Sequence, residues 1–313
     1  MKKHCRLALI FCLILSLMML ASCNGEKTIH TVTFLSAEGE TLATRECTDG
    51  GHVTPPDAPE KMSETFLGWY LSEKSTSFDF SSPVRSDMTL TARYGTDYAS
   101  LTNRIAKEAM SANVTVVTRH YRSPYFYDTS IASGALIENS GGMYFLLTNC
   151  HNVRKSGYIA AEYTVTDCYG NHYKATLNSA DEAYDLAVLY FTPDKELSTL
   201  TLATNSPDLN ITVAAIGQPG GQHNTLTYGK TSAYRPLANA EGEVSAVTFD
   251  ILLHTAPSDH GSSGGAVLDG ELHLVGLDFA VLHDEDGNFL YTAAIPAERI
   301  AEYLAAHPFY YFY

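Results

Sequence analysis

A short loop rich in serine and glycine constrains the fold of this chain more than any other stretch. Residues 258–267 read Ser-Asp-His-Gly-Ser-Ser-Gly-Gly-Ala-Val. The apolar run 247–253 before it predicts a strand, and the apolar runs 266–268 and 272–277 after it predict a hairpin. Ser263 therefore lies in a turn between strands, and it is either part of a flexible connection or a nucleophile with partners elsewhere.

Two candidate partners for Ser263 lie upstream, each at the end of an apolar strand. His151 follows the apolar run 145–147, and Asp185 precedes the run 186–189. A serine hydroxyl needs a base to take its proton, and the base needs a carboxylate to hold it in the right tautomer. The order His, Asp, Ser is that of chymotrypsin and differs from the orders in subtilisins and α/β-hydrolases.

Residues 261–265 also fit the Gly-x-Ser-x-Gly nucleophile elbow of α/β-hydrolases. That fold requires a helix after the serine, and an Asp and a His further downstream. Here a hairpin is predicted instead, and only about 50 residues remain after Ser263. The elbow interpretation therefore fails.

The glycines of the loop allow its backbone to turn sharply and a substrate carbonyl to approach main-chain N–H groups. We expect the N–H groups of Gly261 and Ser263, with Ser262 between them, to form an oxyanion hole. One such donor is typically worth ~2.7–4 kcal/mol in the transition state.

The three motifs resemble those of the HtrA-type trypsin-like serine proteases. Thr-Asn-Cys-His-Asn-Val at 148–153 is similar to their histidine motif, Asp-Leu-Ala-Val-Leu at 185–189 to their aspartate motif, and Gly-Ser-Ser-Gly-Gly-Ala at 261–266 to their serine motif. The resemblance covers roughly residues 112–300 and includes the small-residue strand 133–137.

Two residues depart from the family pattern: Ala266 stands where proline is usual, and Ser262 where asparagine is common. Neither belongs to the triad. The resemblance implies a mainly β fold, with a two-barrel chymotrypsin-like protease domain over residues 111–313. A C-terminal helix is expected to open at Pro296, and the chain leaves no room after it for the PDZ domain that many HtrA-type enzymes carry.

The resemblance implies a serine endopeptidase that acts on protein or peptide substrates without a cofactor or a metal. In this interpretation Ser263 attacks, His151 transfers protons and Asp185 orients His151. The main alternative is a surface binding or adhesion protein whose protease-like domain is inactive. The complete triad argues against that alternative, although a collapsed oxyanion loop would be compatible with it.

The resemblance also places five residues at the substrate pocket: Ser258, His260, Asp278, Phe279 and Ala280. Asp278 stands where glutamate-specific relatives carry a histidine. A carboxylate that faces the pocket would favour basic side chains, whereas one that is hydrogen-bonded to the backbone would leave room for small aliphatic ones. We favour the second interpretation, because Phe279 is expected to narrow the space.

Residues 1–22 resemble a bacterial lipoprotein signal peptide. Three basic residues precede the apolar run 7–20, which is short for a membrane span, and Leu-Ala-Ser-Cys at its end resembles a lipobox. This implies lipidation of Cys23, a tether over 23–28 and a location in the cell envelope, anchored on the extracytoplasmic face of a membrane. The alternatives are an ordinary signal peptide or an uncleaved anchor.

Residues 29–95 are expected to form a separate β-grasp-like domain. The alternating stretches 30–34 and 88–94 predict strands, and Phe-Leu-Gly-Trp-Tyr at 66–70 holds the only tryptophan. The run resembles the internalin-type B-repeat, also called the Listeria–Bacteroides repeat. Two roles stay open: a spacer between the membrane and the protease domain, or a binding site for a cell-surface partner.

The remaining features are less specific. Residues 96–110 space their apolar side chains as a short amphipathic helix and are expected to be a helical linker. Cys47, Cys150 and Cys168 show neither a disulfide framework nor zinc spacing, and Cys150 beside His151 is expected to serve packing. The net charge of −15 argues against binding to nucleic acid and against adhesion to anionic lipid.

Overall fold

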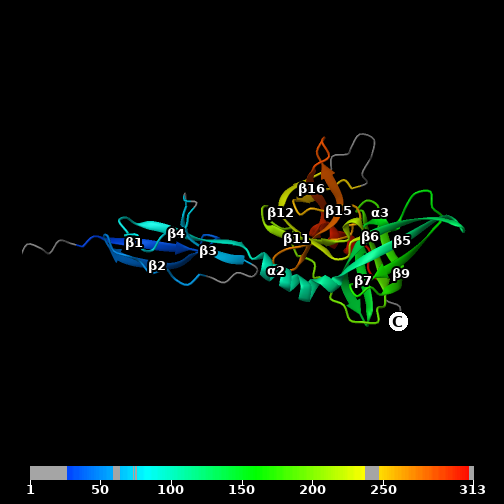
Figure 1. Cartoon of the computed structure of the whole chain (residues 1–313), viewed down its shortest axis with the longest axis horizontal. Coiled ribbons are helices and arrows are strands. Elements are labelled where there is room, and N and C mark those ends of the chain that lie inside the picture. Colours follow the sequence, from blue (N-terminus) through cyan, green and yellow to red (C-terminus); the bar gives the residue numbers. More distant parts are fainter. Residues whose placement is uncertain (1–26, 59–63, 73, 75, 237–246, 310–313) are drawn as a thin grey trace, which may run out of the picture. The chain divides into compact units, whose positions relative to one another are not determined.

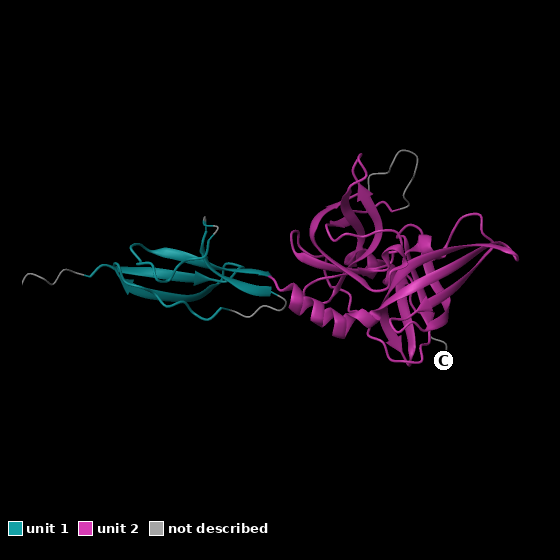
Figure 2. Cartoon of the chain, in the orientation of Figure 1, with its two compact units in different colours: residues 1–95 teal, residues 96–313 magenta. Residues whose placement is uncertain are grey.

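The computed structural model describes residues 27–58, 64–72, 74, 76–236 and 247–309. The chain divides into two compact units, of which unit 1 ends at Gly95 and unit 2 begins at Thr96 (Figure 2). Each unit has a hydrophobic core of its own. Both units are built mainly from strands, as the sequence predicted (Figure 1).

Unit 1 contains a four-stranded sheet in the order β2-β1-β4-β3. β1 (Ile29–Leu35) pairs antiparallel with β2 (Thr41–Thr48) and parallel with β4 (Met88–Thr96), and β3 (Glu64–Leu71) lies at the edge beside β4.

The core of unit 1 is aromatic. Trp69 on β3 is 3% exposed, and its ring lies 4.9 Å from the ring of Phe34 and 5.5 Å from that of Phe66, both edge to face. Phe34 on β1 is fully buried. Edge-to-face aromatic pairs contribute beyond their buried area, so this cluster joins an outer strand to the centre of the sheet.

Unit 2 contains two closed six-stranded barrels, as expected from the resemblance to the chymotrypsin fold. The first barrel has the order β10-β7-β6-β5-β8-β9. Its strands are β5 (Asn113–Ser123), β6 (Phe126–Ser140), β7 (Met143–Thr148), β8 (Ala160–Thr166), β9 (His172–Asp181) and β10 (Leu186–Phe191).

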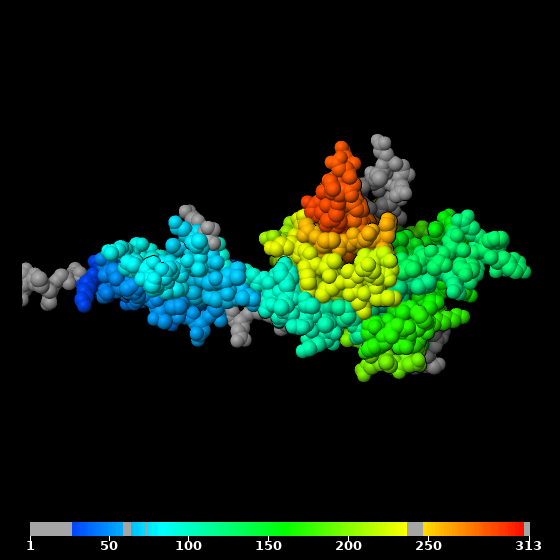
Figure 3. All heavy atoms as spheres, in the orientation of Figure 1, coloured from blue at the N-terminus to red at the C-terminus, as the bar shows by residue number. Residues whose placement is uncertain are grey.

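The second barrel has the order β11-β12-β13-β16-β15-β14. Its strands are β11 (Thr212–Gly217), β12 (Thr225–Arg235), β13 (Ile251–His254), β14 (Ala266–Leu268), β15 (Leu274–His283) and β16 (Phe289–Pro296). The strand expected over 247–253 thus begins later, at Ile251. Figure 3 shows the first barrel, in green, lying against the second, in yellow to orange.

The segment expected to be a helical linker is helical and packs within unit 2. α2 (Tyr98–Arg104) begins at the N-cap Asp97, whose carboxylate accepts from the amide of Ser100, and helical turns continue to Ala112. Leu101 is 1% exposed. The Arg104 guanidinium donates to the carbonyl of Gly270 at 2.7 Å, so the helix is bound to the second barrel.

The C-terminal helix spans the two barrels. α4 (Ala297–Ala306) follows Pro296, where the sequence predicted its start. Tyr303 on its inner face is fully buried, and its hydroxyl is hydrogen-bonded at 2.7 Å to the hydroxyl of Ser179 on β9. The helix therefore follows the last strand of the second barrel and is held to the first.

Among the described residues, no helix is both long enough and apolar enough to cross a membrane. The predicted signal peptide and Cys23 lie outside these residues.

The aromatic core of unit 1 generates a stability prediction. Phe34→Ala removes a fully buried ring and leaves a cavity beside Trp69, so we expect a loss of roughly 3–5 kcal/mol in the free energy of unfolding of this unit. Urea titration followed by tryptophan fluorescence measures it, because Trp69 is the only tryptophan of the chain. Leu67→Ala is the matched control, since Leu67 is 54% exposed. Equal midpoints for the two variants would contradict the assigned core.

Candidate active site

The pairing of two buried strands brings His151 and Asp185 together. β7 and β10 are antiparallel neighbours in which Thr148 lies opposite Ala187. His151 follows β7 in the short helix α3 (Cys150–Val153), and Asp185 directly precedes β10. Because antiparallel register places the end of one strand beside the start of the next, both residues lie at the same rim of the first barrel.

Both carboxylate oxygens of Asp185 accept hydrogen bonds from His151. Oδ1 accepts from the backbone amide at 2.9 Å, and Oδ2 is 2.7 Å from Nδ1 of the ring. Asp185 has a φ of 50°, in the left-handed region, and its carbonyl accepts from the Cys150 amide and from the side chain of Asn149, each at 3.1 Å. The carboxylate is thereby fixed against one edge of the imidazole.

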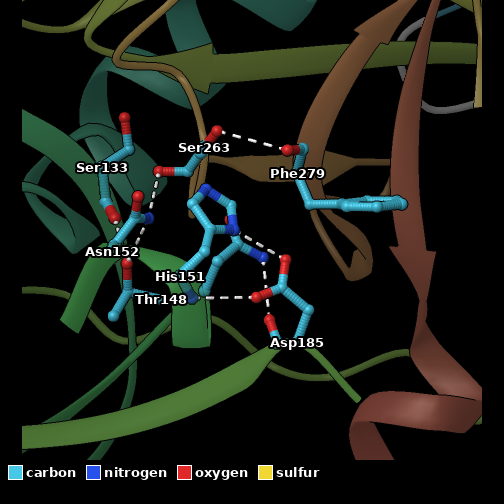
Figure 4. Close-up of polar contacts among 8 residues, drawn as sticks. Ser133, Thr148, His151, Asn152, Asp185, Ser263 and Phe279 are labelled. Carbon is cyan, nitrogen blue, oxygen red and sulfur yellow. Dashed lines mark hydrogen bonds and ion pairs between the residues drawn. The ribbon is translucent and has the colours of Figure 1, made fainter. Parts of the chain in front are cut away.

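Ser263 lies on the far side of the imidazole from Asp185 (Figure 4). Its hydroxyl donates to the carbonyl of Phe279 at 3.3 Å. Among the described residues no hydrogen bond joins this hydroxyl to His151. The structure therefore gathers the three predicted triad residues, with the His–Asp contact formed and the Ser–His contact open. Catalytic hydrogen bonds are often loose in the absence of substrate.

Ser133 on β6 attaches the serine loop to the first barrel. Its amide donates to the carbonyl of Ser263 at 2.9 Å, and its hydroxyl donates to the carbonyl of Gly261 at 2.8 Å. The same hydroxyl accepts from the amide of Gln218 at 2.9 Å. The Asn152 side chain adds a further bond to the Ser263 carbonyl at 3.2 Å (Figure 4). Ser133 is fully buried, so these contacts are protected from water.

The backbone amides of residues 260–265 divide into two groups. Those of His260, Ser262, Gly264 and Gly265 donate to oxygens of the protein. Those of Gly261 and Ser263 donate to no described residue. The two donors that the sequence assigned to the oxyanion hole are thus available to a ligand, whereas the amide of Ser262 is bonded to the carbonyl of Asp259 at 3.0 Å.

Two glycines of the loop are required by its geometry. Gly261 has a φ of 97° and Gly264 a φ of 87°, in the region that side chains disfavour. A Cβ on Gly264 would lie 2.1 Å from the carbonyl oxygen of Ser133, and one on Gly261 would lie 2.5 Å from that of Gln218. The loop can approach the neighbouring backbone this closely only without side chains.

All five residues predicted for the substrate pocket line one cavity together with His151 and Ser263. The lining comprises His151, Ser258, Asp259, His260, Ser263, Asp278, Phe279, Ala280, Val281 and His283. Within the part of the chain that the structure describes, the carboxylate of Asp278 accepts no hydrogen bond from the backbone, contrary to the interpretation favoured from the sequence. Its Oδ1 accepts instead from Nε2 of His254, at 2.8 Å.

Sequence reasoning missed Ser133, Asn152 and His254 as parts of the site. Each is a polar residue in or beside an otherwise apolar stretch, and each is buried in the structure. That contrast was visible in the sequence, but the partner of each residue lies far away along the chain.

Among the residues described, no cluster of histidine, cysteine, aspartate and glutamate could hold a metal ion. Cys47, Cys150 and Cys168 carry free thiols.

Two family descriptions match the chain. Residues 132–277 match the trypsin-like peptidase domain, and residues 30–93 match the Listeria-Bacteroides repeat domain. The resemblances inferred from the sequence are thus confirmed for both segments.

Curated relatives of the chain are named as proteases, and each is longer than the matched region. The magnetosome formation protease MamE of Magnetospirillum gryphiswaldense is 35% identical over 49% of this chain and 19% of its own length. A probable periplasmic serine protease do/HhoA-like of Haemophilus influenzae is 30% identical over 54% of this chain and 34% of its own length. The chain therefore spans about a fifth to a third of these relatives.

Solved protease structures share the fold. The active form of the Rv3671c protease from M. tuberculosis superimposes with a TM-score of 0.55 at 24% identity, covering 69% of this chain and 88% of that one. The HtrA-type protease AlgW with a tripeptide gives a TM-score of 0.54 at 25% identity, covering 66% of this chain and 63% of that one.

The thiol of Cys150, which precedes the candidate base His151, generates a testable prediction. Burial, and then the negative charge of Asp185, raise the pKa of Cys150 to about 12. A thiol with a raised pKa stays protonated below that value, so Cys150 is expected to resist iodoacetamide at pH 8 in the folded protein and to react once urea unfolds it. Mass spectrometry of the labelled peptides measures both states. Rapid labelling of folded Cys150 would contradict its role in packing.

Proposed function

We propose that unit 2 is a serine endopeptidase that hydrolyses peptide bonds of protein substrates through Ser263, His151 and Asp185. The observation that carries the proposal is the two-point contact between His151 and Asp185. It fixes the ring with Nδ1 on the carboxylate and leaves Nε2 on the side of Ser263 (Figure 4). The similarity to serine proteases supports the same reaction class.

The proposed reaction begins when Ser263 Oγ attacks the carbonyl carbon of the scissile bond and Nε2 of His151 takes the hydroxyl proton. The hydroxyl must first leave the carbonyl of Phe279 and rotate toward the imidazole. Asp185 stabilises the imidazolium that forms. His151 then gives the proton to the departing amine, and a water molecule hydrolyses the acyl-enzyme by the same proton transfer in reverse.

The unpaired amides of Gly261 and Ser263 are the proposed oxyanion hole. The carbonyl of His260 accepts from the amide of Gly220 at 2.7 Å, which fixes the plane of the His260–Gly261 peptide. Because N–H and C=O point in opposite directions in a trans peptide, this contact directs the Gly261 amide away from Gly220. Hydrogen-bond donors whose positions are fixed before the reaction stabilise the developing negative charge, because they do not have to reorient during it.

We further propose that the protein is anchored by a lipid on Cys23 on the extracytoplasmic face of a membrane. The lipobox-like sequence before Cys23 supports the anchor. The name of the Haemophilus influenzae relative, a probable periplasmic serine protease, supports the extracytoplasmic location.

One observation favours a second candidate function, a surface binding protein with an inactive protease-like domain. The Ser263 hydroxyl is bonded to Phe279 and not to His151. In that case unit 1, which matches the Listeria-Bacteroides repeat, would bind a cell-surface partner. The unpaired amides of Gly261 and Ser263 favour the enzyme, because a collapsed loop would not offer two free donors to a substrate.

Labelling with a fluorophosphonate probe tests the proposed function. The purified protein without its signal peptide is expected to be labelled on Ser263, and Ser263→Ala is expected to abolish labelling. Asp185→Asn should slow labelling on the order of 10⁴-fold, because it permits the wrong histidine tautomer. Asp194→Asn removes an exposed carboxylate from the loop after β10 and should change nothing. A folded wild type that is not labelled would favour the binding protein.

The lipid anchor generates a separate prediction. Wild-type protein expressed with its signal peptide is expected to incorporate radiolabelled palmitate, and Cys23→Ser is expected to incorporate none, because the variant lacks the thiol that is acylated. Cys47→Ser is the matched control and should behave as the wild type. Wild-type protein that incorporates no palmitate would contradict the anchor.

A further inference from the structure

Asp278 is held at a fixed position beside the nucleophile. Its carbonyl accepts from the amide of Gly264 at 2.7 Å, and its amide donates to the carbonyl of Gly265 at 2.9 Å. The carbonyl of the next residue, Phe279, accepts a hydrogen bond from the hydroxyl of Ser263. The side chain of Asp278 lines the cavity that also contains Ser263 and His151. A substrate side chain that enters this cavity next to the attacked carbonyl therefore meets Asp278.

The two oxygens of the Asp278 carboxylate differ in their surroundings. Oδ1 accepts from Nε2 of His254, which is fully buried behind it. Oδ2 has no hydrogen-bond partner among the described residues. Asp278 itself is only 3% exposed, so the free acceptor is largely removed from bulk water. An oxygen in this position favours a ligand that donates hydrogen bonds.

His254 orients Asp278 through one of its two ring nitrogens. Its other ring nitrogen, Nδ1, is buried and has no partner among the described residues. A doubly protonated ring would bury a charged N–H without an acceptor, which is costly. The neutral ring with its proton on Nε2 satisfies the contact with Asp278 and leaves only a lone pair unpaired. In this arrangement His254 occupies one oxygen of the carboxylate, and the other oxygen remains for a hydrogen-bond donor in the cavity.

The other charged and titratable groups of the cavity lie nearer to solvent. Asp259, His260 and His283 are exposed, whereas Asp278 is buried. Charges at an exposed rim are screened by water and salt, so the buried carboxylate dominates the field inside the cavity. Ala280 and Val281 also line the cavity and are apolar, so the methylene groups of a long basic side chain can pack against them.

The Phe279 ring leaves space for such a side chain. The sequence suggested that Phe279 narrows the pocket, which favoured small aliphatic residues. In the structure the ring is 8% exposed, belongs to the main hydrophobic core and points away from Ser263 (Figure 4).

We propose that Asp278, oriented by His254, selects a lysine or arginine side chain immediately before the scissile bond. The selection rests on the proposed function, because it concerns the substrate of that same site. A charged hydrogen-bond donor binds such an acceptor roughly ten- to a hundred-fold more tightly than a neutral donor does. This ratio sets the expected size of the preference for Lys and Arg.

Peptides that differ only in the residue before the scissile bond test the selection. The set carries Lys, Arg, Gln, Val or Ala at that position. Wild-type protein is expected to cleave the Lys and Arg peptides roughly ten- to a hundred-fold faster in kcat/KM than the other three. Asp278→Asn keeps the acceptor for His254 and removes the charge, so it should lose this preference. Glu285→Gln removes an exposed carboxylate outside the cavity lining and should retain it.

Fluorophosphonate labelling of the same samples separates the two proposals, because the probe carries no basic group. Labelled wild-type protein that cleaves Gln, Val or Ala peptides as fast as Lys and Arg peptides overturns the selection by Asp278. The proposed enzymatic function stands in that case. Wild-type protein that is neither labelled nor active overturns both. If Asp278→Asn does not fold, competition by benzamidine with labelling of the wild type decides: protection supports a cation subsite, and no protection overturns it.

Discussion

The contact between Ser133 and the serine loop is the interaction on which the site depends. Neither barrel contains the whole machinery: His151 and Asp185 come from the first, and Ser263 comes from the second. Ser133 donates to the carbonyls of Gly261 and Ser263 from inside the first barrel. Its hydroxyl also accepts from the amide of Gln218, so the backbone and the side chain of one buried residue together fix Gly261 and Ser263 relative to the first barrel.

The strand register of each barrel then places the remaining groups. Pairing of β7 with β10 brings His151 to Asp185, and pairing of β14 with β15 brings Asp278 beside the serine loop. These positions follow from backbone hydrogen bonds, which leave little freedom at the rim of a closed barrel. The contact that is not formed is the one between the hydroxyl of Ser263 and His151, and this hydroxyl can rotate about one bond. The proposed mechanism thus begins with a rotation of one side chain about a single bond.

Two electrostatic environments lie around Ser263. The amides of Gly261 and Ser263 offer positive partial charge where an oxyanion would form, and the carboxylate of Asp278 offers negative charge a short way along the chain. Burial strengthens the effect of the Asp278 carboxylate because water screens it little. Orientation of a substrate would follow from the two together, with its carbonyl drawn to the amides and a basic side chain drawn to the carboxylate.

The sequence by itself determined the strand-rich fold, the two units and the approximate places of His151, Asp185 and Ser263, because apolar runs and turn residues are local signals. It also indicated glycine at 261 and 264, where the backbone turns. Only the tertiary structure decided that Ser133 joins the barrels, that His254 lies behind Asp278 and that Phe279 turns its ring into the core. The physical reason is that these contacts link residues far apart along the chain, and local patterns carry no information about which distant side chain fills a given space.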